Sequence, residues 1–238
     1  MRKIEHLWTE PMDKEKQSIE RLQLVLRECN RFRTAVVSGL KQLPVDSLRR
    51  QVASLFIATM LDHYSSITYL LGEERYDFAT SAFALVRPII DSAFRGVWIA
   101  NFATDEEINL SLTPTGYKVF EKVKPVMLYD LMKERFNIDD ALQSHFKKDW
   151  QSVHGFVHTG TEQLKHRLEG VKSKAYPYER AIAALIMSSY YVMVGSAYVS
   201  VSTQNLDTGV SIVKAHDLLR SRVEIVRAGD KTKSHLVN

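Results

Sequence analysis

An uncharged segment, residues 181–202, constrains the fold of this chain more than any other stretch of its sequence. Its 22 residues are long enough to cross a membrane as a helix. They include five serines and three tyrosines, which are poorly suited to hydrocarbon, and no excess of Lys or Arg marks one side of the segment. A helix that is apolar all round is also what the centre of a large bundle requires. We therefore expect residues 178–204 to form the central helix of a soluble bundle, with no contact to a membrane.

Turn-forming residues are scarce in the rest of the chain. Its 238 residues include 10 glycines and 6 prolines, whereas a β-sandwich or barrel needs a turn roughly every 8–12 residues. Apolar residues instead recur three and four positions apart, which is the period of one helical face. The predicted helices, besides 178–204, cover residues 14–42, 46–71, 76–102, a short stretch from 104, 117–135, 139–154, 159–169 and 208–227.

This pattern predicts one all-α domain over residues 1–238, an antiparallel bundle of about seven to eight helices. The core should span residues 14–228, and the basic stretch 229–238 should be disordered. Pro88 predicts a kink without a break in the helix 76–102, because it cannot donate to the carbonyl of Ala84. Pro125 predicts a similar irregularity in the helix 117–135, and residues 111–116 (SLTPTG) form the clearest loop.

Several classes of protein and chemistry find no support in the sequence. A lone cysteine, Cys29, cannot form an internal disulfide, and its place on an apolar helical face indicates a core residue. The N-terminal residues lack the apolar segment of a signal peptide, which makes a cytoplasmic protein the expectation. There is no GxGxxG, Walker or GxSxG motif, and His154 and His158 are too few to hold zinc. We expect no cofactor and no metal.

Three charged residues interrupt an otherwise apolar predicted helix. Arg87, Asp91 and Arg95 follow one another at four-residue spacing, so they form one stripe among apolar neighbours. Charges on such a face are rarely buried unless they are paired. One interpretation is a structural clamp, in which Asp91 pairs with an arginine and holds neighbouring helices in register. The other is a phosphate site, because one carboxylate cannot neutralise two guanidiniums.

A second polar group lies in the segment 150–167, where the start of a predicted helix could form an anion site. His158 directly precedes a predicted helix start, where Thr159 and Glu162 fit a capping box. Backbone N–H groups at a helix start attract anions, and a histidine there can exchange a proton near neutral pH. The alternative is that His158 simply packs at a bend. The candidate phosphate-binding residues in and near this segment are Lys148, Thr159, Gly160, Thr161 and Arg167.

Two sequence segments resemble a family of uncharacterised all-helical bacterial proteins. They are SAFALVRPIIDSAFRGVWIANFATDEE (81–107) and SVHGFVHTGTEQLKHR (152–167). Proteins of this kind are similar in turn to the HEPN group (higher eukaryote and prokaryote nucleotide-binding domains). The resemblance implies a helical bundle that is usually dimeric and often belongs to a toxin–antitoxin or phage-defence system. It also implies partners of two kinds, RNA or a nucleotide and a cognate protein.

Many HEPN proteins are metal-independent ribonucleases whose motif is an arginine followed by four to six residues and a histidine. No histidine of this chain has an arginine at that spacing. By resemblance, His158 or His154 would act as general base on the ribose 2′-hydroxyl. Arg87, Arg95 or Lys148 would then stabilise the negative charge on the phosphorane. The sequence leaves open a ribonuclease, a non-catalytic nucleotide- or protein-binding relative, and a bundle in which the polar residues are clamps.

Overall fold

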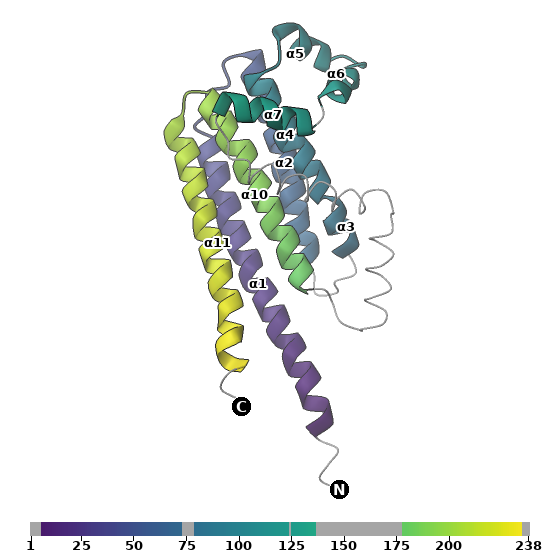
Figure 1. Cartoon of the computed structure of the whole chain (residues 1–238), viewed down its shortest axis with the longest axis vertical. Helices are drawn as coiled ribbons and strands as arrows, with labels where there is room; N and C mark the ends of the chain where they lie inside the picture. Colours follow the sequence, from purple (N-terminus) through teal and green to yellow (C-terminus); the bar gives the residue numbers. More distant parts are fainter. Residues whose placement is uncertain (1–5, 73–78, 124, 137–177, 235–238) are drawn as a thin grey trace.

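The computed structural model describes residues 6–72, 79–123, 125–136 and 178–234, and these form helices joined by short connections (Figure 1). The long helices run along one axis, while the short helices α5, α6 and α7 gather at the end away from both termini (Figure 1). The all-α bundle predicted from the sequence is confirmed. The helices are α1 (His6–Leu40), α2 (Leu48–Gly72), α3 (Ala79–Ala84), α4 (Val86–Asn101), α5 (Asp105–Ser111), α6 (Tyr117–Lys122), α7 (Pro125–Phe136), α10 (Tyr178–Ser202) and α11 (Leu206–Ser234).

Helix α10 is the centre of the bundle, as its uncharged sequence predicts. It packs against α1, α2, α4 and α11. Within the described residues it is the one helix long and apolar enough to cross a membrane, and 56% of its most apolar window is buried inside the protein. Its buried serines are accommodated partly by their own helix, because Ser189 donates to the carbonyl of Ile186 and Ser200 to that of Ser196. This burial is that of a core helix.

A glycine sets the spacing between the two helices at the heart of the bundle. A Cβ atom on Gly195 of α10 would lie 3.0 Å from the Cβ of Ala93 and 3.1 Å from its Cα, on α4. It would also lie 3.1 Å from the sulfur of Met60 on α2. Such distances are shorter than ordinary van der Waals contacts between carbon atoms. The backbones of α4 and α10 therefore approach as closely as they do because this position has no side chain.

Ion pairs join α1, α10 and α11 along their outer edges. Arg222 on α11 donates to Glu28 on α1 at 2.5 Å. Glu179 at the start of α10 lies 3.2 Å from Arg21 of α1 and 3.7 Å from Arg227 of α11. The carboxylate of Glu179 is more than half exposed, so its pairs contribute little stability individually. The Glu179 carboxylate also lies in the first turn of α10, where a negative charge interacts favourably with the positive end of the helix dipole.

Two helices that the sequence predicts as continuous are each divided in the structure. The helix expected over 76–102 is interrupted at the single residue Leu85, three residues before Pro88. The backbone of Leu85 stays in the right-handed helical region (φ −77°, ψ −13°), so the irregularity predicted from Pro88 is present as a one-residue interruption. Because Pro88 has no N–H, the carbonyl of Ala84 lacks its usual helical hydrogen bond. The N–H of Leu85 donates to the carbonyl of Ala82, three residues earlier, which is the pattern of a tighter 3₁₀ turn. Similarly, α6 and α7 are separate helices on either side of residues 123–124.

The first and last helices are longer than predicted. α1 begins at His6, before the predicted start at residue 14, and α11 continues to Ser234, beyond the predicted end at Arg227. Residues 229–234, which were expected to be disordered, thus belong to a helix. The predicted helix start at Thr104 is confirmed by a complete capping box, in which its hydroxyl accepts from Glu107 N–H and the Glu107 carboxylate accepts from Thr104 N–H.

A small polar cluster is enclosed between α1, α2 and α11. Cys29 and Tyr64 are fully buried, and their side chains lie side by side. Burial raises the pKa of the Cys29 thiol to about 12, so this thiol is protonated and unreactive at neutral pH. His216 is 2% exposed and packs against the rings of Phe32 and Tyr190. The prediction that Cys29 is a core residue is confirmed.

His216 predicts a loss of stability in acid. The pKa of His216 is lowered from 6.5 to about 4, mainly by burial and to a smaller extent by the nearby Arg220, against an opposing effect of Asp217. The folded state therefore binds the proton less tightly than the unfolded state does, and stability falls as pH drops from 6.5 towards 4. At pH 5 the loss should be about 2 kcal/mol relative to pH 7.

Urea unfolding of the wild-type protein and of His216→Phe at pH 7 and pH 5 measures this effect. The variant should lose most of the difference between the two pH values, while a His63→Gln control should retain it. An unchanged difference in His216→Phe would assign the acid sensitivity to other groups.

Candidate functional site

The stripe formed by Arg87, Asp91 and Arg95 occupies the partly exposed side of α4. Most of the other residues of this helix are buried, including Ile90, Phe94 and others at positions between the three charges. The side chains of Arg87 and Asp91 are 21% and 28% exposed, so water reaches them only in part. The three charges therefore lie on one half-buried face of α4, as their four-residue spacing predicts.

The pairing within this stripe is loose. Arg87 Nε lies 3.8 Å from Asp91 Oδ2, which is within ion-pair range but beyond hydrogen-bond distance. Burial raises the pKa of Asp91, and the opposing effects of Arg95 and Arg87 do not cancel it. The formal charge of the three groups is +1 when Asp91 is ionised and +2 when it is protonated. The three groups by themselves therefore carry a net positive charge, which increases when Asp91 is protonated, and Arg87 makes a further contact besides the one with Asp91.

Arg95 also contacts an aromatic cluster that includes Phe120 of α6. Its guanidinium carbon lies 5.0 Å from the centre of the Phe120 ring, a cation–π arrangement. Phe120 in turn packs edge-on against Phe56 and Trp98, with ring centres 5.3 and 6.0 Å away. The cluster holds the Arg95 guanidinium in one place without neutralising it. An arginine fixed in this way loses less side-chain entropy when it binds a phosphate.

The remaining sequence-predicted site residues lie outside the part of the chain that the structure describes. They are His154, His158, Lys148, Thr159, Gly160, Thr161 and Arg167. The proposed meeting of these residues with Arg87 and Arg95 therefore stays a prediction. Among the described residues, no three His, Cys, Asp or Glu side chains form a group that could hold a metal ion.

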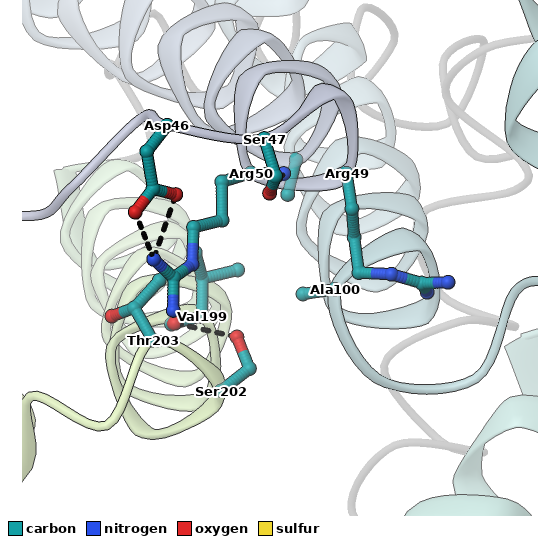
Figure 2. A pocket seen from close by; sticks show the side chains of 9 residues that line it. Asp46, Ser47, Arg49, Arg50, Ala100, Val199, Ser202 and Thr203 are labelled. Atoms are coloured by element: carbon teal, nitrogen blue, oxygen red, sulfur yellow. Dashed lines mark hydrogen bonds and ion pairs between the residues drawn. The ribbon is translucent and has the colours of Figure 1, made fainter. Parts of the chain in front are cut away.

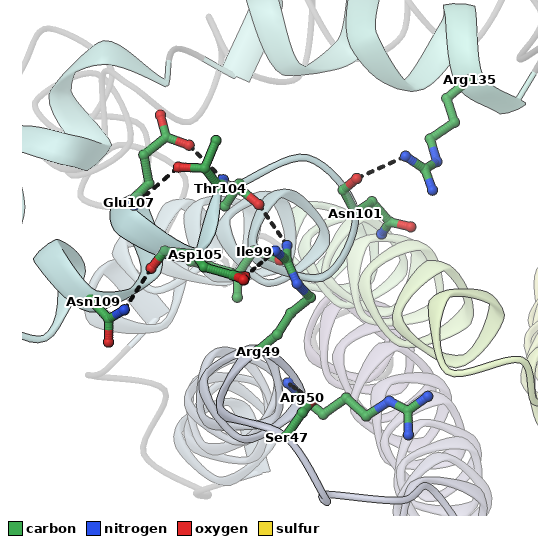
Figure 3. Close-up of polar contacts among 11 residues, drawn as sticks. Ser47, Arg49, Arg50, Ile99, Asn101, Thr104, Asp105, Glu107, Asn109 and Arg135 are labelled. Carbon is green, nitrogen blue, oxygen red and sulfur yellow. Dashed lines mark hydrogen bonds and ion pairs between the residues drawn. The ribbon is translucent and has the colours of Figure 1, made fainter.

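A second pair of arginines, at the start of α2, was not singled out in the sequence. Arg49 Nη1 donates to the carbonyls of Ile99 and Ala103 at 2.9 and 2.6 Å, and its Nη2 donates to Asp105 at 2.8 Å (Figure 3). Arg49 thus closes the end of α4 and ties the start of α5 to α2. A positive charge in the first turn of a helix interacts unfavourably with the helix dipole. Two consecutive arginines there, Arg49 and Arg50, could therefore have indicated from the sequence that these side chains contact other parts of the protein.

Arg50 borders a hollow at this end of the bundle (Figure 2). The hollow has a volume of about 480 Å³, within the range of small-molecule sites. We call it the Arg50 hollow. It lies between the start of α2, Ala100 on α4 and the end of α10, and the residues around it are Asp46, Ser47, Arg49, Arg50, Ala53, Ala100, Val199, Ser202 and Thr203.

The comparisons with known proteins assign a family but no activity. No curated protein and no solved structure matches the chain significantly. A family model described as "Family of unknown function (DUF6988)" matches residues 57–223, which include α4, α10 and the segments 81–107 and 152–167. The match covers most of the chain, and the protein belongs to this DUF6988 family.

Proposed function

We propose that this protein is a cytoplasmic, homodimeric, HEPN-like protein that binds RNA through its phosphates, with Arg87 and Arg95 as the anchoring residues. The observation that carries the proposal is the half-buried stripe on α4, in which two guanidiniums flank one loosely paired carboxylate. Arginine presents planar N–H donors that match phosphate oxygens. Membership of a toxin–antitoxin or phage-defence system, with a cognate protein partner, is part of the same proposal.

Substituting the two arginines should weaken RNA binding. A guanidinium–phosphate hydrogen bond contributes about 1.5–3 kcal/mol, so Arg87→Ala and Arg95→Ala should each raise the Kd for a short single-stranded RNA about tenfold or more. Each substitution should also reduce the salt dependence of binding by about one phosphate contact. Fluorescence anisotropy at two ionic strengths measures both quantities.

The control is Arg220→Ala, which removes an exposed arginine that pairs with Glu224 in the same four-residue spacing. It should leave the Kd nearly unchanged. Asp91→Asn should strengthen RNA binding, because it removes the one negative charge of the stripe. Unchanged RNA binding in Arg87→Ala and Arg95→Ala, together with a large drop in their melting temperatures, would contradict the proposal and assign the stripe to the clamp.

The catalytic form of the proposal makes His158 the general base, with His154 beside it and Arg87 or Arg95 stabilising the charge on the phosphorane. RNA should then be cleaved in the presence of EDTA, and His158→Ala should abolish cleavage while RNA binding persists. His63→Ala is the matched control. Binding without cleavage in the wild-type protein would favour the alternative, a non-catalytic nucleotide- or protein-binding module.

A further inference from the structure

The solvent-facing side of α2 carries almost no charge. Its exposed residues recur three and four positions apart and therefore form one stripe along the helix. We call them the α2 stripe, and they are Leu48, Gln51, Leu55, Ala58, Thr59, Asp62, Ser66, Tyr69 and Gly72. Asp62 is the one charged residue among them. The exposed side of α11, by contrast, carries both basic and acidic side chains, such as Lys214 and Asp217, as is usual for a helix surface in contact with water.

Large apolar side chains protrude from the α2 stripe. Leu55 and Tyr69 are 63% and 69% exposed. Thr59 and Ser66 donate their hydroxyl protons to carbonyls four residues earlier in the same helix, so covering these hydroxyls leaves no donor unpaired. An exposed surface with large apolar side chains and little charge is typical of a site that binds another protein.

An apolar hollow borders the α2 stripe on the side of α1. Its volume is about 230 Å³, and its lining residues include Leu40, Ala58 and Leu61, all of which are partly or fully exposed. Ala58 belongs both to the hollow and to the α2 stripe, so the two features form one continuous surface. Because Ala58 is small, a second helix can approach α2 closely at this position.

Two opposite charges on this surface have no partner within the part of the chain that the structure describes. The side chains of Asp62, on the stripe, and Lys41, at the hollow, are both exposed and make no ion pair or hydrogen bond there. Their separation along the helices explains why they do not pair with each other. Lys41 lines the hollow together with Ser54, and Asp62 lies eight residues beyond Ser54, about 12 Å along α2.

A two-fold axis at Ala58 would bring these charges together between two copies of the chain. Ser54 and Asp62 are each four residues from Ala58, so antiparallel α2 helices centred there place Asp62 of one copy level with Lys41 of the other. Symmetry produces the same pair twice. The same arrangement places Tyr69 of one copy level with Leu48 of the other, because these residues lie eleven and ten positions from Ala58.

We propose that the α2 stripe and the adjoining hollow form the interface through which two copies of this chain pair. The α2 helices cross antiparallel at Ala58, Leu55 is covered close to the axis, and Asp62 of each copy pairs with Lys41 of the other. The inference rests on the homodimer of the proposed function, whose interface it locates, and not on RNA binding.

Analytical ultracentrifugation of the full-length protein at micromolar concentrations tests this interface. The wild-type protein should sediment as a dimer. Leu55→Glu should raise the dimer Kd about a hundredfold or more, because it brings a carboxylate into an apolar contact beside Asp62 of the other copy. Leu218→Glu is the matched control, since Leu218 is 51% exposed on α11 and should tolerate the same change without loss of the dimer. A monomeric wild-type protein, or a Leu55→Glu variant as dimeric as the wild type, would overturn the proposal.

Charge reversal tests the predicted pair of Asp62 with Lys41. Asp62→Lys and Lys41→Glu should each raise the dimer Kd about tenfold, because each places like charges opposite each other twice. The double variant should restore a Kd close to that of the wild type. Single variants that weaken the dimer without recovery in the double variant would contradict the assigned pairing.

RNA binding, measured on the same samples by fluorescence anisotropy, separates this inference from the RNA proposal. A protein that pairs through the α2 stripe and binds no RNA supports the interface and contradicts the RNA site. A monomeric protein that binds RNA through Arg87 and Arg95 overturns the interface and leaves the RNA site standing.

Discussion

Gly195→Leu is expected to lower the free energy of unfolding by about 3 kcal/mol or more. Even a Cβ atom at this position meets the backbone of Ala93 at 3.1 Å and the sulfur of Met60 at 3.1 Å. Three further carbon atoms have no space unless α4 and α10 separate. Urea denaturation followed by circular dichroism measures the loss.

A second glycine provides the control for this prediction. A Cβ atom on Gly209 of α11 would lie 3.4 Å from its nearest neighbour, the carbonyl oxygen of Ala197, which is ordinary contact. Gly209→Ala should therefore stabilise the protein by about 0.5 kcal/mol, because alanine loses less backbone entropy in a helix. Gly195→Ala should have the opposite sign. Equal effects of the two alanine substitutions would show that the α4–α10 approach does not limit packing.

Arg49→Ala should cost about 3–4 kcal/mol of stability, since each charge-assisted hydrogen bond to a backbone carbonyl contributes about 1.5–3 kcal/mol. The substitution leaves the carbonyls of Ile99 and Ala103 without this partner at a partly buried helix end. The ion pair with Asp105 adds little, because that carboxylate is 89% exposed. The change should appear in the midpoint of urea unfolding.

Arg50→Ala, one residue further on, is the matched control for Arg49→Ala. The pair of Arg50 with Asp46 is a partly exposed contact within one chain segment, so its loss should change stability by about 0.5 kcal/mol or less. Similar losses in both variants would mean that Arg50 also holds the bundle end together.

The half-buried stripe on α4 could be predicted from the sequence because its evidence is local. Three charges at four-residue spacing among apolar residues share one side of any helix, whatever the helix packs against. The loose ion pair and the raised pKa of Asp91 could not be predicted in the same way. They depend on how much water the neighbouring helices exclude, and on the Phe120 ring that α6 brings to Arg95.

The Arg50 hollow and the role of Arg49 are contributions of the tertiary structure alone. Arg49 donates to carbonyls 50 and 54 positions later in the chain, and those carbonyls accept its hydrogen bonds only because α4 ends beside the start of α2. The residues around the hollow come from three helices that are distant in sequence. No spacing rule connects them.

The sequence by itself determined that this chain forms a bundle around residues 178–202. The evidence was its helical period, its few turn residues and one uncharged segment, and the physical reason is that burial of apolar faces is the dominant driving force of folding. The position of the interruption at Leu85, the close approach at Gly195 and the hollow beside Arg50 were decided only when the helices packed. Distances between helices depend on every side chain at the interface together, and a linear pattern does not contain them.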